Sequence, residues 1–109
     1  MLSLELCKAL KAAGWPRLVG KRRLTLAPID GKRLYEEVWE PTEDQLDDAI
    51  MGLIGDRIQH YTVKGYRFGD KVFWAVTAKR YNEGIYSCVT QGRHEAKAHV
   101  WLKLRGMEA

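Results

Sequence analysis

The sequence predicts a single α+β domain, residues 1–109, in the order α-β-β-α-β-β-β-α, with an antiparallel sheet of about five strands and three helices. A length of 109 residues suits one core. Stretches with helical periodicity lie at both ends and in the middle of the chain. Between them run alternating aromatic and β-branched segments separated by turn residues. We therefore expect the helices to pack mostly on one face of the sheet.

The first helix is predicted from Ser3, a suitable N-cap, to Ala13. Gly14 and the following Trp15-Pro16 should end it. Asp30-Gly31 then separates two alternating runs, which predicts a hairpin with strands near 22–28 and 33–39. The buried helix face should consist of Leu6, Cys7, Leu10 and Ala13.

The middle helix is predicted within "PTEDQLDDAIMGLIGD". Thr42 and Gln45 have the spacing of a capping box, and Gly55 should end the helix. Its apolar side chains recur at helical spacing at Leu46, Ala49, Ile50, Leu53 and Ile54.

Three further strands are predicted at roughly 57–67, 71–79 and 85–90, because "FGDKV" and "RYNEGI" read as turns. In the central strand alternate side chains point to opposite faces. We expect Val72, Trp74, Val76 and Ala78 to meet the helices, and Phe73, Ala75, Thr77 and Lys79 to face the other way.

The last helix should start at Gly92, a weak N-cap, and close the core. Ala96, Val100, Leu104 and Met107 form its buried stripe. Tryptophan and arginine are the usual anchors of protein interfaces. Four residues of this helix are therefore candidates for contact with a protein partner: His94, Trp101, Leu102 and Arg105.

Charge is segregated along the chain. Residues 34–56 hold eight acids and no Lys or Arg, whereas residues 17–33 hold six bases and one acid. The acids at the start of the middle helix favour its dipole. An exposed acidic block could alternatively imitate a nucleic-acid backbone, or pair with the basic region of a second copy in an oligomer.

The basic segment is the alternative functional region. Its hairpin would gather cations able to contact phosphates. Lysine and arginine also protect edge strands from aggregation, so a structural role is equally open. The candidate nucleic-acid-binding residues are Arg17, Lys21, Arg22, Arg23, Lys32 and Arg33.

Catalysis and cofactors are not expected. The chain contains no nucleophile elbow, phosphate-binding glycine loop, His-Glu-x-x-His or Cys-x-x-Cys motif. His94 and His99 lie about 140° apart around a helix and would not converge on one metal ion. We expect no enzyme activity, no cofactor and no metal.

The start of the chain lacks the pattern of a signal peptide, and no long apolar run suggests a membrane segment. Cys7 and Cys88 have no metal-binding spacing and suit buried thiols in a reducing compartment. We expect a cytoplasmic protein without a membrane partner.

Four segments, "LELCKALKAAGWP", "EPTEDQLDDAI", "FWAVTA" and "AKAHVWLKLRG", resemble in order a group of short uncharacterised proteins of phages and prophages. The group has a Thr-Pro cap where this chain has Gly92-Arg93, and lacks the basic hairpin. A weaker likeness is to HicB-type antitoxins, in which a strand ending in glycine precedes a Glu-Glu-Ala helix. The resemblance implies a phage or prophage source, a bacterial host cytoplasm and a similar fold, but no particular activity.

Together these features predict a small non-enzymatic accessory protein that binds a protein partner or itself. The alternative is nucleic-acid binding through the 17–33 hairpin.

Overall fold

The strands divide into two separate antiparallel sheets. The computed structural model describes residues 2–29, 32–55, 60–80 and 84–106, with the backbone alone at 27–29 and 32–34. Strands β1 (Lys21–Ile29) and β2 (Lys32–Glu40) pair with each other, whereas β3 (Tyr61–Phe68), β4 (Lys71–Arg80) and β5 (Gly84–Thr90) form a three-stranded sheet in the order β3-β4-β5. Helices α1 (Leu4–Ala12), α2 (Glu43–Ile54) and α3 (Arg93–Leu104) complete the fold.

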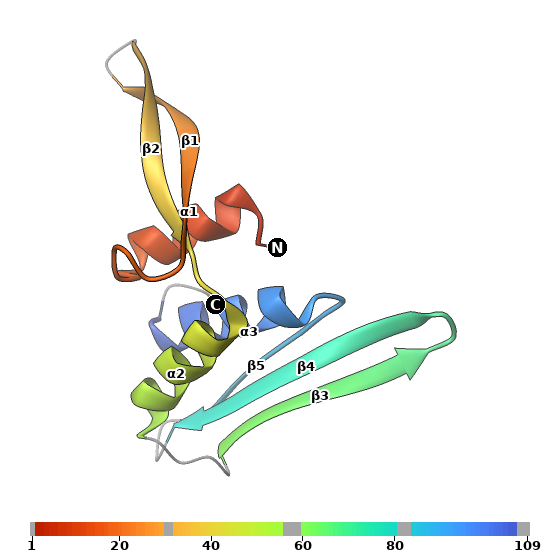
Figure 1. Ribbon diagram of the computed structural model, residues 1–109. Helices are drawn as coiled ribbons and strands as arrows, with labels where there is room; N and C mark the ends of the chain where they lie inside the picture. Colours follow the sequence, from red (N-terminus) through yellow and green to blue (C-terminus); the bar gives the residue numbers. More distant parts are fainter. Residues whose placement is uncertain (1, 30–31, 56–59, 81–83, 107–109) are drawn as a thin grey trace.

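The α+β class and the order α-β-β-α-β-β-β-α are therefore confirmed. The expected sheet of about five strands is instead a pair of sheets, since the hairpin β1–β2 packs on α1 rather than beside β3–β5 (Figure 1). Val38 of β2 is fully buried there. The hairpin turn at residues 30–31 and the expected strand start at 57–59 lie outside the described residues.

The helix ends follow the sequence signals. Ser3 Oγ accepts a hydrogen bond from the Leu6 N–H and caps α1. Thr42 and Gln45 form the reciprocal capping box of α2, and Gly55 ends it with a left-handed φ of 79°. At the start of α3, Gly92 provides no side-chain cap. These three helix starts confirm the predicted boundaries.

Helices α2 and α3 cover one face of the sheet β3–β5, as Figure 1 shows. Val76 and Ala78 of β4 point at them and are fully buried. Val72, near the other end of the same strand, lies beyond the helices and is 43% exposed. The prediction that this face of β4 meets the helices is thus correct for the second half of the strand. The first half of the face is open.

Trp74 lies on this inner face where the cover ends, and it is half-buried. Its cross-strand partner is Gly65, and a Cβ at that position would come within 3.2 Å of the indole ring. The Arg93 guanidinium lies 5.0 Å from the ring centroid. The lack of a side chain at Gly65 on β3 therefore leaves room for the indole ring, and the Arg93 guanidinium of α3 packs against it.

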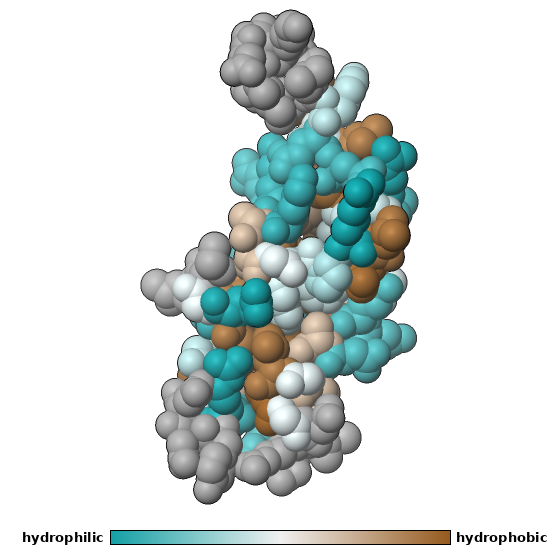
Figure 2. Space-filling view, turned by 90° about the vertical axis from the view of Figure 1, so that its left-hand side faces the viewer, coloured by the Kyte–Doolittle hydropathy of each residue, from teal (hydrophilic) through white to brown (hydrophobic). Residues whose placement is uncertain are grey.

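One core joins the hairpin, the helices and the sheet. Figure 2 shows that, viewed from the side, hydrophobic surface appears in separate patches among hydrophilic ones on an elongated molecule. The largest fully buried side chains are Leu2, Cys7, Leu10, Val38, Pro41, Leu46, Ile50, Val76 and Val100.

Candidate interaction surface

The face of β3–β5 turned away from the helices is covered by no segment of the described chain (Figure 1). Strand alternation and the pairing register define the residues on it. We call it the outer sheet face. It consists of Thr62, Lys64, Tyr66, Phe68, Lys71, Phe73, Ala75, Thr77, Lys79, Ile85, Ser87 and Val89.

Aromatic and aliphatic side chains lie open on the outer sheet face. Phe68 is 68% exposed and Val89 is 62% exposed. Tyr66 lies directly opposite Phe73 in the register, and the rings of Phe68 and Phe73 meet edge to face with centroids 5.9 Å apart. A shallow hollow of about 480 Å³ is lined by Tyr66, Phe68, Phe73, Ala75 and Val89.

The charge of this face has one sign. Strands β3, β4 and β5 contain five Lys and Arg residues and no Asp or Glu. Lys64, Lys71 and Lys79 belong to the outer sheet face and are exposed. No ion pair of these lysines with another described residue is found, and Asp70, the acid next to Lys71 in the chain, lies in the turn between β3 and β4. Their charge is available to a partner.

Three arginines among the candidate residues of the basic hairpin are ion-paired, unlike the lysines of the outer sheet face. Arg17 and Arg22 both pair with Glu37 of β2, which lowers the pKa of that carboxyl chiefly through the hydrogen bond from Arg22. Arg23 pairs with Glu40 at 2.9 Å and donates to the Leu2 carbonyl. Two carboxylates of β2 thus form ion pairs with three of the six candidate cations. This pairing gives the arginines a structural role.

The remaining hairpin candidates do not form a patch in the described chain. Lys21 at the start of β1 is exposed. Lys32 and Arg33 belong to β2, but their side chains lie outside the part of the chain whose side chains are described. Among the hairpin candidates whose side chains the structure describes, the three arginines are all ion-paired.

Part of the acidic block is also ion-paired within the molecule. Glu43 accepts from Arg93 Nε at 2.6 Å and also pairs with Lys97. These contacts lower the pKa of Glu43 from 4.5 to about 2, against an opposing effect of burial. The ammonium of Lys97, only 6% exposed as a residue, also lies 3.0 Å from Asp47. Glu43 and Asp47 of α2 thus bind cations of α3, whereas Asp44 and Asp48 of the same helix are exposed.

Two of the four candidate interface residues on α3 are buried in the fold. Trp101 is 5% exposed and packs edge to face on Trp15, with ring centroids 5.1 Å apart. Leu102 is 3% exposed. The helical wheel placed them off the main stripe, but α1 packs on α3 from that side and adds a second buried face.

His94 and Arg105 also have partners in the fold. His94 Nε2 lies 2.6 Å from the Pro41 carbonyl oxygen. Arg105 donates to the Ala13 carbonyl, and its guanidinium lies 5.7 Å from the centroid of Trp101. Both side chains tie α3 to the preceding elements. The four α3 candidates thus do not form a free surface together.

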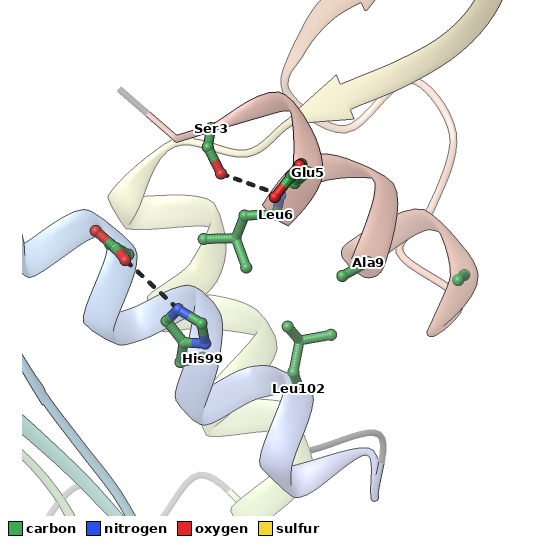
Figure 3. Close-up of a pocket in the computed structure, with 8 residues that line it drawn as sticks. Ser3, Glu5, Leu6, Ala9, His99 and Leu102 are labelled. Atoms are coloured by element: carbon green, nitrogen blue, oxygen red, sulfur yellow. Dashed lines mark hydrogen bonds and ion pairs between the residues drawn. The ribbon is translucent and has the colours of Figure 1, made fainter. Parts of the chain in front are cut away.

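A groove of about 510 Å³ separates α1 from α3, and Figure 3 shows Leu6 and Leu102 at its floor. His99 on its wall lies 3.6 Å from a carboxylate oxygen of Glu95. Ser3, at one end, is occupied as the cap of α1. The lining contains two carboxylates and no Lys or Arg: Ser3, Glu5, Leu6, Ala9, Ala12, Glu95, His99 and Leu102.

The described residues contain no group of three or more His, Cys, Asp or Glu side chains placed to hold a metal ion. No helix there has the length and apolar character to cross a membrane. Cys7 and Cys88 are not joined by a disulfide, and burial raises the pKa of Cys7.

Comparison of the chain with protein-family models, with curated proteins and with solved structures finds no match. The surface chemistry therefore carries the functional argument.

The outer sheet face was missed as a site, although alternation in β4 already separated its residues from the core-facing ones. The available signal was the interleaving of lysines with aromatics in "VKGYRF" and "KVFWAVTAK". What the sequence could not give was the uncovered state of that face, which depends on both flanking helices packing on the same side.

Proposed function

We propose that this protein is a small non-enzymatic accessory protein of the phage or prophage type, which acts as a binding module through its outer sheet face. The resemblance of four segments to short phage and prophage proteins supports the accessory class. No cofactor is invoked, and the bacterial cytoplasm is the proposed site of action.

One observation carries the proposal: large apolar side chains stand exposed together on a regular sheet. Tyr66, Phe68 and Val89 are 46%, 68% and 62% exposed, and all three line the same hollow. Contiguous exposed apolar surface of this kind marks interaction sites in folded proteins. The core does not need these residues, since β4 already buries Val76 and Ala78 on its other face.

Two classes of partner fit an exposed aromatic surface, a protein (including a second copy of the chain) and a nucleic acid. The hairpin has less support as a nucleic-acid site, because Arg22 and Arg23 are held by Glu37 and Glu40. Both partner classes share the same prediction about where contact occurs.

Site-specific photocrosslinking tests that prediction without assuming the partner. A benzophenone analogue of phenylalanine would replace Phe68, and in a control it would replace Asp48, an exposed residue of α2. After irradiation of bacteria expressing each form, adducts would be treated with nuclease or protease. Adducts at position 68 but not at 48 support the proposal. Equal or absent labelling at both positions would reject it.

A further inference from the structure

We infer that the outer sheet face binds single-stranded nucleic acid, with bases stacked on its aromatic rings and phosphates beside its lysines. This inference rests on the proposed function and names the chemistry of the partner. The residues that carry it are Tyr66, Phe68 and Phe73 with Lys64, Lys71 and Lys79.

The rings offer stacking platforms. Every base has a π-face, so exposed aromatic side chains on a sheet bind successive bases with little sequence preference. Tyr66 is 46% exposed and Phe68 is 68% exposed. Phe73 lies between them in the hollow, opposite Tyr66 and edge-on to Phe68. The three rings therefore form one continuous cluster at the turn end of β3 and β4.

The lysines match a polyanion. Their charges stand on the same face as the rings, and no carboxylate of β3, β4 or β5 opposes them. Lys71 and Lys79 are eight residues apart on β4, which corresponds to roughly 27 Å along an extended strand. Phe73 and Ala75 lie between them, so a backbone following the strand would pass cations at both ends of the apolar surface.

Several cations elsewhere in the fold are ion-paired, in contrast to the lysines of the outer sheet face. Arg23, Arg93 and Lys97 are each engaged by carboxylates of β2 or α2. The outer sheet face is where lysines and aromatic rings are both left free in the described chain. A protein partner would use the apolar side chains equally well, but three lysines without an ion pair among the described residues, interleaved with aromatic rings, match the alternating phosphates and bases of a single strand.

Single strands are favoured over duplexes. Bases in a duplex are stacked on each other and expose only their edges in the grooves, which are read by an inserted helix or ribbon. The described outer sheet face is a broad surface with a shallow hollow, and it offers no inserting element. Unpaired bases are therefore the matching ligand.

The test is fluorescence anisotropy of labelled oligothymidylate and oligouridylate of about fifteen nucleotides, titrated with the whole chain at low and physiological salt. We expect binding whose log–log salt slope is roughly −2, from three phosphate contacts on a single strand. The matched duplex should bind more weakly. Absence of binding at low salt, or equal binding of duplex and single strand, would overturn the inference.

Two matched pairs of variants locate the contact. Tyr66→Ala should weaken binding roughly 5- to 150-fold through loss of one stacked base. Tyr35→Ala removes a more exposed tyrosine, at 70% against 46% for Tyr66, from the hairpin and should leave affinity unchanged. Lys64→Gln with Lys71→Gln should reduce the salt slope to roughly −0.7, whereas Lys21→Gln should not alter it. Circular dichroism checks that each variant folds.

The opposite pattern, with loss in the hairpin variants and none at Tyr66, would overturn the inference and move the site to β1–β2. A photocrosslinked protein at position 68 without oligonucleotide binding would reject the nucleic acid and leave the binding module standing. Failure of both experiments would reject the proposed function itself.

Discussion

The indole rings of Trp15 and Trp101 meet edge to face, 5.1 Å between centroids and 77° between planes, where the segment after α1 packs against α3. Each is buried, at 7% and 5% exposure. The Trp15 Nε1–H donates to the Val19 carbonyl, which also fixes the loop before β1. This pair joins the N-terminal part of the fold to the last helix.

Trp101→Ala is expected to lower the free energy of unfolding by about 3–5 kcal/mol, because it opens a large cavity in the core. Urea denaturation followed by circular dichroism measures the change. Trp101→Phe should recover most of the loss, since it restores an aromatic contact with Trp15. A loss below about 1 kcal/mol in the alanine variant would contradict the burial of Trp101 in the core.

The ion pairs of Glu43 should make stability depend on pH. Its pKa is lowered to about 2 in the folded state from an ordinary 4.5, so the carboxylate stabilises the fold above pH 4.5. That contribution is lost as the pH falls from about 4.5 to 2. Because the side chain is partly exposed, we expect about 1–2 kcal/mol. Urea denaturation across this range should show a smaller decline in Glu43→Gln; an unchanged pH profile would contradict the pairing.

Arg22 and Arg23 are adjacent in sequence but should differ in their effect on stability. Arg23→Gln leaves the Glu40 carboxylate, which is 10% exposed, without its cation, and should cost about 2–3 kcal/mol. Arg22→Gln breaks an exposed pair and should cost about 0–1 kcal/mol. Thermal and chemical denaturation compare the two. Equal costs would mean that Glu40 is not held by Arg23.

Two glycines offer opposite outcomes for the same substitution. Gly52 lies inside α2 with nothing within 4 Å of an added Cβ, so Gly52→Ala should stabilise the fold by about 0.5–1 kcal/mol. At Gly20, where φ is 114°, an added Cβ would lie 2.2 Å from the Glu40 carbonyl oxygen. Gly20→Ala should therefore destabilise by more than about 1 kcal/mol. Melting temperatures should move in opposite directions, and a shift of the same sign in both would contradict this geometry.

Local signals in the sequence were sufficient to predict the helices and strands. The Thr42–Gln45 capping box and the Gly55 stop predict α2 because they satisfy backbone groups within a few residues. The alternation of β4 likewise separates Val76 from Phe73 without reference to the rest of the chain. Such rules act over short distances, so they need no knowledge of the tertiary structure.

Features that depend on packing between distant segments could not be predicted from the sequence. The division into two sheets depends on α1 seating the hairpin, and the burial of Leu102 depends on α1 approaching α3. The charge runs were visible, but their mutual pairing was not: Arg23 and Glu40 are 17 residues apart. Exposure, and therefore the candidate site, follows from these packings.

Nuclear magnetic resonance mapping on the labelled protein tests the central claim most directly. Addition of a short oligothymidylate should shift the resonances of β3–β5, with the largest changes at Lys64, Tyr66 and Phe73 and little change in β1–β2. Changes confined to the hairpin around Arg22, or no changes at protein excess and low salt, would contradict a single-stranded nucleic acid on the outer sheet face.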